Sequence, residues 1–144
     1  MLFSQATGRK VVSTDTATTV GIIADFVIDP HLPGVIALTL AKTAGRDHTL
    51  RWTNITAFGA DAVTVPTSSS VEAPDTRVAE LANKSHDLLH KRVLSTAGAA
   101  LGVVVDVEFD QASGRFAALL LDDGRAIDAT RLLGIGSYAA VVRA

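Results

Sequence analysis

The chain has 144 residues, with 13 Lys and Arg against 15 Asp and Glu, and therefore a formal net charge of −2. Direct nucleic-acid binding lacks its usual electrostatic basis, because no stripe of Lys and Arg with interleaved aromatic residues is present. The chain has no cysteine, which excludes a disulfide framework and a thiolate metal site. The apolar runs are shorter than the ~20 residues of a membrane span, and the first residues do not resemble a signal peptide. We expect a soluble cytoplasmic protein.

A nine-residue pattern occurs twice, at residues 21–29 and 102–110. Each copy reads Gly, three aliphatic residues, Asp, two positions, an aromatic or aliphatic residue, and Asp. The β-branched residues favour strands, and side chains of a strand alternate between its two faces. Unbroken alternation predicts that the core-facing residues are Ile22, Ala24, Phe26 and Ile28 in the first copy and Val103, Val105, Val107 and Phe109 in the second.

Turn residues and short apolar runs surround the first copy. A polar, Thr-rich stretch at 13–19 predicts a hairpin connection, and the two prolines and glycine of residues 29–34 predict a tight turn. The segment 35–41 is apolar on both faces, which is typical of a strand buried on both sides. A closing strand is predicted at 62–65.

A linker follows at residues 66–87. Asp75 is placed to cap a short helix from about Thr76 to Asn83, with Val78 and Leu81 as its apolar contacts. We expect this helix to lie across one half of the chain or to cover a sheet edge.

The second half repeats the features of the first. A basic pair followed by Val, Val or Leu, Ser and Thr precedes each long strand, at 9–14 and 91–96. An apolar strand follows the second copy at 116–121, and residues 122–124 predict a tight turn. The repeat predicts a first unit at 1–65, a linker with a short helix at 66–87, and a second unit at 88–144.

The repeated motif resembles the PRC-barrel family over residues 5–65 and 88–143. The shared features are the basic pair with Val-Val/Leu-Ser-Thr, the Gly-x-Val-x-Asp-x-x-Phe/Ile-Asp strand, the hydrophobic strand after it, and the closing Gly-x-Asp/Ser-Ala-Val-Val segment. The family includes the cytoplasmic domain of the photosynthetic reaction-centre H subunit and the C-terminal domain of a ribosome-maturation factor. The resemblance implies an all-β fold of two tandem small PRC-like barrels, related by a pseudo-twofold. Because the motif consists of packing and turn residues, it implies fold more strongly than activity.

Two sets of residues are candidates for contacts between the units or with a partner. The strands at 35–41 and 116–121 have apolar residues on both faces, so one face is predicted to meet the sister unit. The only tryptophan is either an anchor for a partner or part of the core. The predicted interaction residues are Val35, Ala37, Trp52, Phe116 and Ala118.

The polar motifs offer weaker chemistry. Asp106, Glu108 and Asp110 alternate along one strand and form a candidate hard-cation site, but a solvated strand end, partly paired with Arg115 or Arg125, is the favoured explanation. His86 and His90 have the i, i+4 spacing of a zinc-binding helix, but the acid beside them is Asp87 and no third ligand follows. No nucleophile motif or phosphate-binding loop is present. We therefore predict no cofactor.

These observations favour a non-catalytic protein-interaction or adaptor module. The predicted partner is another protein or protein complex, with a homodimer as a further possibility and no direct contact with nucleic acid. The alternative is a small-ligand or divalent-cation sensor that uses the acidic strand face or the seam between the two barrels. Family members that dock onto larger complexes imply the adaptor function.

Overall fold

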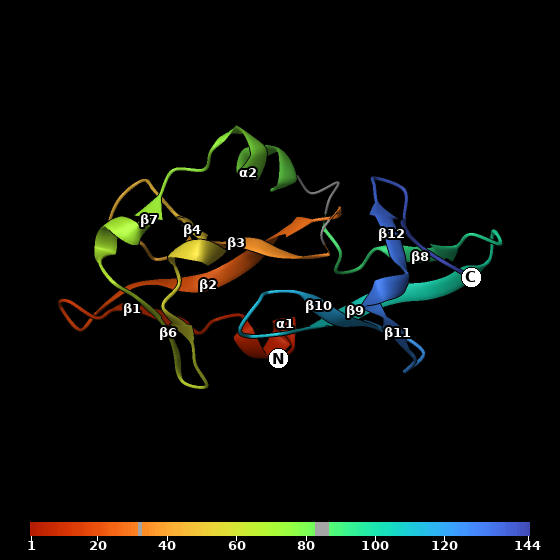
Figure 1. Ribbon diagram of the computed structural model, residues 1–144, viewed down its shortest axis with the longest axis horizontal. Coiled ribbons are helices and arrows are strands. Elements are labelled where there is room, and N and C mark those ends of the chain that lie inside the picture. Colours follow the sequence, from red (N-terminus) through yellow and green to blue (C-terminus); the bar gives the residue numbers. More distant parts are fainter. Residues whose placement is uncertain (32, 83–86) are drawn as a thin grey trace.

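A computed structural model describes residues 1–31, 33–82 and 87–144 of the chain (Figure 1). The first half contains α1 (Phe3–Ala6), β1 (Lys10–Ser13), β2 (Thr18–Asp29), β3 (Gly34–Ala41), β4 (Thr49–Arg51), η1 (Trp52–Asn54), β5 (Ala57–Phe58) and β6 (Ala62–Val65). The linker contains η2 (Ser68–Ser70), β7 (Val71–Glu72) and α2 (Thr76–Leu81). The second half contains β8 (Arg92–Ser95), β9 (Ala100–Phe109), β10 (Phe116–Leu121), β11 (Ala126–Asp128), η4 (Ala129–Arg131), β12 (Leu132–Ile135) and β13 (Ala140–Val142).

The two halves have the same strand topology, which confirms an all-β fold of two barrel-like units. The sheet of the first unit has the order β5-β6-β1-β2-β3-β4-β7, and that of the second has the order β12-β13-β8-β9-β10-β11. Each strand from β1 to β6 therefore has a counterpart from β8 to β13. The parallel pairs β1–β6 and β8–β13 are equivalent as well. Only β7 lacks a counterpart among the described residues.

Both long strands contain a bulge at the same place in the repeat. In β2, Ile23 pairs with Leu40 and Asp25 with Thr39, so Ala24 is the extra residue. In β9 the extra residue is Val105. A bulge moves the following side chains to the opposite face, and this corrects the predicted core face. The residues buried around the bulges are Ile23, Phe26 and Ile28 in β2 and Val104, Val107 and Phe109 in β9, while Ala24 is exposed and Val105 is 48% exposed.

The repeated aspartates stabilise local backbone geometry. Asp25 and Asp106 accept a hydrogen bond from the amide of the next residue at 2.8 and 2.9 Å, immediately after the bulge. Asp29 accepts a hydrogen bond from the His31 amide at 2.9 Å, and Asp110 accepts bonds from two amides in the equivalent turn. The Asp pattern of the sequence thus marks a bulge and a turn.

The two units share one continuous hydrophobic core. All five phenylalanines and Trp52 form an aromatic cluster where the units meet. Phe3 of α1 stacks on Phe26 of the first unit, with ring centroids 4.0 Å apart, and contacts Phe109 and Phe116 of the second unit at 5.6 and 5.8 Å. Figure 1 shows α1 beside β9 and β10 of the second unit.

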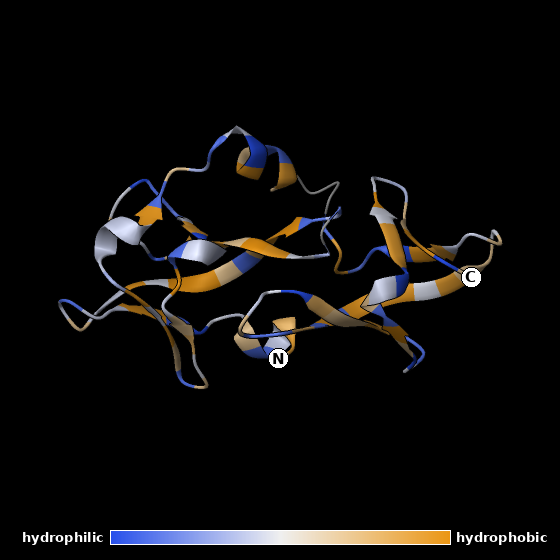
Figure 2. Cartoon of the chain, viewed as in Figure 1, coloured by the Kyte–Doolittle hydropathy of each residue, from blue (hydrophilic) through white to orange (hydrophobic). Residues whose placement is uncertain are grey.

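The linker covers the outer face of the first unit. β7 pairs with β4, and Val78 and Leu81 of α2 pack against Val27 and Ala37 of β2 and β3. The Asp75 side chain caps α2 by accepting a hydrogen bond from the Val78 amide at 2.8 Å. The predicted capped helix and its contacts are confirmed, with its end at Leu81. Figure 1 shows α2 above β3 and β4, and Figure 2 shows hydrophobic residues interspersed with hydrophilic ones along the strands of both units.

None of the described helices is both long enough and apolar enough to cross a membrane.

Candidate functional site

Three of the predicted interaction residues lie at the seam between the units. The Val35 amide donates a hydrogen bond to the Gly114 carbonyl at 2.8 Å, and the Phe116 amide donates one to the Pro33 carbonyl at 2.9 Å. These two bonds are equivalent under the repeat, so the seam is self-complementary in the manner of a twofold interface. Val35 and Phe116 are buried there, and half-buried Trp52 contacts Phe109 of the second unit.

Ala37 and Ala118 do not lie at the seam, so their predicted placement is wrong. The register of β3 contains a shift at Ile36, and that of β10 a shift at Ala117. Each shift turns the alanine to the face opposite its seam residue. Ala37 is completely buried beneath α2. Ala118 occupies the equivalent position in the second unit, where it remains partly exposed.

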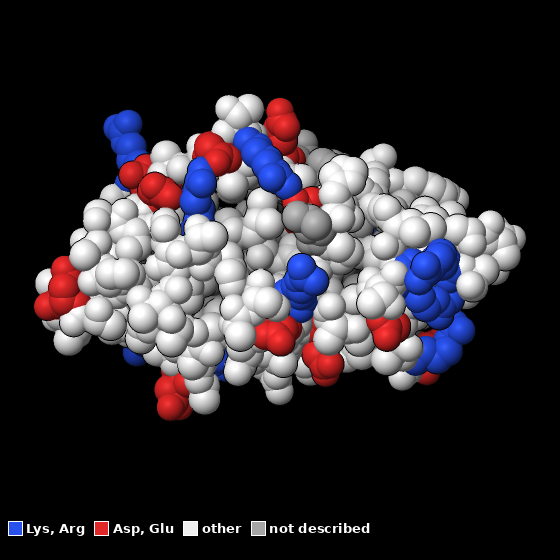
Figure 3. Space-filling view, in the orientation of Figure 1, with Lys and Arg blue, Asp and Glu red and all other residues white. Residues whose placement is uncertain are grey.

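We define the outer face of the second unit by two cross-strand rows. One row is Glu108, Ala118 and Asp128, and the other is Asp106, Leu120 and Ala126. Three of these residues are carboxylates and none is basic. Figure 3 shows separate acidic side chains along the lower margin of the second unit, with a group of basic side chains beside them at the lower right. The face thus has a partly buried apolar centre with acidic residues around it.

The edge of this face differs from its counterpart in the first unit. β11 pairs with β10 through Asp128, Ile127 and Ala126. No strand of the described chain pairs with its other edge. In the first unit, the equivalent strand β4 is covered by β7. An open edge presents backbone groups to which a further strand can add.

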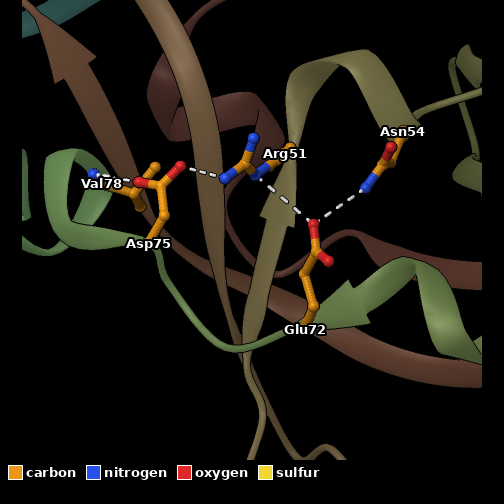
Figure 4. A network of polar contacts seen from close by, with 5 residues as sticks. All are labelled: Arg51, Asn54, Glu72, Asp75 and Val78. Carbon is orange, nitrogen blue, oxygen red and sulfur yellow. Dashed lines mark hydrogen bonds and ion pairs between the residues drawn. The ribbon is translucent and has the colours of Figure 1, made fainter.

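A polar network holds the linker on the first unit (Figure 4). Arg51 of β4 forms ion pairs with Glu72, 3.4 Å from Nε to Oε1, and with Asp75. The Asn54 side chain donates a hydrogen bond to Glu72 at 3.3 Å. The residue equivalent to Arg51 in the second unit is Asp128, because Arg51 pairs with Ala37 and Asp128 with Ala118. The charge at this position is therefore reversed between the units.

A second ion pair joins α2 to the buried end of β2. Asp29 is 1% exposed, and its carboxylate pairs with the Arg77 guanidinium, whose side chain is 64% exposed. A buried carboxylate needs such a partner, because desolvation otherwise disfavours its charge. This ion pair fixes the first turn of α2 against the turn that follows β2.

The three acidic candidates for a cation site have separate structural roles. Asp106 accepts hydrogen bonds from the amide and hydroxyl of Ser4, and Asp110 caps its own turn at 2.7 and 3.1 Å. Glu108 is exposed. Within the described ranges no group of three His, Asp or Glu side chains is arranged to hold a metal ion.

Asp128 caps η4 in addition to its place in the outer face. The Thr130 amide and hydroxyl donate hydrogen bonds to its carboxylate at 2.9 and 2.7 Å. The hydrogen bond from the Thr130 amide lowers the pKa of the Asp128 carboxyl below its ordinary 3.8, and the Thr130 hydroxyl and the nearby Arg131 charge act in the same direction. The group is consequently an anion at neutral pH and stays one into mildly acidic solution.

The histidine pair does not form a zinc-binding helix through His90. That residue has a left-handed φ of 66° in the turn before β8. The other member, His86, lies outside the described residues. The equivalent of His90 in the first unit is Gly8, with a φ of 88°, and both amides donate to the long strand, His90 to Val104 and Gly8 to Ile23. The position is therefore a conformational requirement of the repeat.

Two hollows lie away from the outer face. A groove of about 430 Å³ at the rim of the seam is lined by Trp52, Ile55, Phe58 and the turn at 111–112, among others. A wide cleft of about 490 Å³ is lined by residues that include His90, Arg92 and Tyr138. Arg92 lies over the Tyr138 ring, 4.7 Å from its centroid.

The sequence analysis included Ala118, Asp106 and Glu108 but missed Asp128 and the open edge of β11. Aligning the repeats strand by strand would have paired Arg51 with Asp128 and revealed the reversed charge. The same alignment would have shown that the first unit has a segment after β6, at 66–81, that no described part of the second unit matches.

Comparison with known proteins agrees with the fold. The family model described as the PRC-barrel domain matches residues 82–142. No curated protein matches the chain. The matched segment contains β8 to β13, whose order the first unit repeats. The match covers the second half of the chain and supports the resemblance to the PRC-barrel family that the repeated motif predicts.

Proposed function

We propose that this protein is a non-catalytic interaction module, an adaptor that docks onto another protein through the outer face of its second unit. The observation that supports the proposal most directly is internal. The first unit covers its outer face with β7 and α2, whereas the equivalent face of the second unit, around Ala118, stays open.

The rest of the molecule is consistent with a scaffold. The aromatic residues fill the seam, and the repeated aspartates support bulges and turns. Functional groups that catalyse reactions need a nucleophile, base and orienting group within hydrogen-bond reach. The repeated motif residues pack the core or hold bulges and turns, so we assign no enzymatic activity.

The proposal is tested by crosslinking and capture from the cytoplasm of the source organism, with the wild-type chain and two matched variants. Ala118→Arg puts a bulky cation on the outer face, and Ala60→Arg makes the same change at an exposed position of the first unit. We expect a partner that is retained by Ala60→Arg and lost by Ala118→Arg, while circular dichroism shows both variants folded. Capture that is identical for all three proteins would refute docking through this face.

A broad hydrolase screen tests the non-catalytic part of the proposal. We expect no turnover above that of a boiled control. Turnover that disappears in Asp106→Asn would establish an enzyme and overturn the adaptor function.

A second candidate function is a small-ligand sensor that uses the groove at the rim of the seam. Trp52 lines this groove together with residues of the second unit, so a ligand bound there would contact both units. Intrinsic fluorescence measures this directly, because the chain has one tryptophan. A saturable change with a small-molecule library favours the sensor, and an unchanged spectrum removes it.

A further inference from the structure

The first unit shows what kind of segment covers an outer face of this fold. Val71 and Glu72 add a short strand to the edge of β4. After a turn, Val78 packs against the face itself, on Val27 and Ala37. The occupant is thus a two-residue strand that pairs at the edge, followed by a short helix that lays apolar side chains on the centre of the face. In the second unit no described strand pairs with the edge of β11, and the described chain reaches the equivalent face only at its margin, where Ser4 of α1 binds Asp106.

Charge specifies the occupant further. Arg51, at the edge of the first face, receives two acidic residues of the linker, Glu72 and Asp75. Asp128 has the equivalent place in the second unit. The remaining charged residues of the second face are Asp106 and Glu108, both acidic. An acidic segment would be repelled there, whereas a basic one is complementary.

We propose that the outer face of the second unit binds a basic segment of a partner protein, which adds a short strand to β11 and places Lys or Arg side chains against Asp128 and Glu108. This inference rests on the proposed function and names the chemistry of its partner. In such strand addition the main-chain hydrogen bonds provide affinity and the side chains provide specificity. The apolar centre at Ala118 and Leu120 accepts a small hydrophobic side chain of the segment.

The chain itself supplies the test peptides. A synthetic peptide with the sequence of residues 68–82 represents the acidic occupant of the first face. A second peptide with Glu72→Lys and Asp75→Lys carries basic residues where the first carries the partners of Arg51. Both are titrated into the full-length protein, and amide shifts are followed by ¹⁵N NMR. We expect the basic peptide to shift the amides of 126–128, and to do so less as salt rises, while the native peptide leaves them unchanged.

A charge-reversal variant sharpens the test. Asp128→Arg gives the second unit the residue that the first unit has at this position, so the fold accommodates it. We expect this variant to raise the dissociation constant of the basic peptide by about fivefold, which is the upper end for the loss of one exposed ion pair. We also expect the variant to bind the native peptide. Glu108→Arg is a second variant on an exposed position. Asp15→Arg makes the same charge change in an exposed turn of the first unit and should leave binding unaltered.

Three results would overturn the inference. These are equal binding of the two peptides, shifts that do not include 126–128, and basic-peptide binding that Asp128→Arg and Glu108→Arg leave unchanged. Failure of this inference is distinguishable from failure of the proposed function. If Ala118→Arg abolishes partner capture but neither peptide binds, docking through the face stands and only the basic strand is refuted.

Discussion

The two units have the same strands in the same order, yet they differ in what covers them. The first unit uses its own linker, held by Arg51 and Arg77, to pair the edge of β4 and bury Ala37. The second presents the equivalent Ala118 and the edge of β11 to solvent. The described chain therefore contains one self-covered unit and one open unit, and their outer faces differ in charge where Arg51 corresponds to Asp128 and Val27 to Glu108.

The largest expected effect comes from Phe3, whose replacement tests whether the two units unfold as one structure. Phe3→Ala removes a buried ring that contacts phenylalanines of both units. We expect the free energy of unfolding to fall by about 3–5 kcal/mol. Urea denaturation followed by Trp52 fluorescence and by circular dichroism should give one coincident transition that moves as a whole.

Phe3→Leu is the control, because it retains most of the apolar contact and should cost less. Two separable transitions, of which Phe3→Ala shifts only one, would show that the units unfold independently.

The next prediction compares the equivalent aspartates that end the long strands. Asn at position 29 or 110 keeps the side-chain oxygen that accepts the turn amides. Only Asp29→Asn loses an ion pair, that with Arg77. We expect Asp29→Asn to lower the free energy of unfolding by about 1–2 kcal/mol and Asp110→Asn to change it by less than about 0.5 kcal/mol.

Thermal or urea denaturation of the two variants in parallel measures this difference in the free energy of unfolding. Equal effects of Asp29→Asn and Asp110→Asn would mean that the linker helix contributes nothing through its ion pair.

Arg51→Asp gives the first unit the residue of the second and should open its covered face. The change replaces two attractions, to Glu72 and Asp75, by repulsion. The pairs are partly exposed, so we expect a cost of about 1 kcal/mol. Amide hydrogen exchange in α2 should accelerate by about fivefold while that in β9 stays the same. Arg46→Asp, in an exposed loop, is the matched control, and equal exchange in both variants would contradict the assigned role of Arg51.

Much of the fold could be predicted from the repeat. The strand at 116–121, the closing strand at 62–65, and the capped linker helix with Val78 and Leu81 all follow from local patterns. The side chains of the long strands that point toward the core could not be predicted correctly. A period of two assigns Val103 and Val105 to the core, but a single bulge residue reverses the assignment. Bulges have no reliable sequence signature here, because Ala24 and Val105 are ordinary strand residues.

The candidate site was harder to predict for a related reason. Ala118 was included for its apolar neighbourhood, and Asp106 and Glu108 as possible cation ligands, yet they share a face with Asp128 only through strand pairing. Pairing partners across this face lie 6 to 14 residues apart in sequence, and local patterns do not specify register. The openness of the face depends on a segment that the other unit has, which becomes visible only when the two sheets are compared.

The smallest effect concerns pH and belongs to the second unit. Hydrogen bonds from Thr130 lower the pKa of Asp128 below 3.8, so its ionised form stabilises the folded state. That contribution is fully present above pH 3.8 and is lost as the pH falls through the lower pKa of the folded state. The first unit has Arg51 at the equivalent position and no such dependence.

We expect Asp128→Asn to flatten the loss of stability in acid, and a carboxyl ¹³C titration to place the Asp128 midpoint below 3.8. Thr130→Val, which keeps the amide and removes the hydroxyl, should raise that midpoint part of the way back, and a midpoint at or above 3.8 in the wild-type chain would contradict the capping role of Asp128.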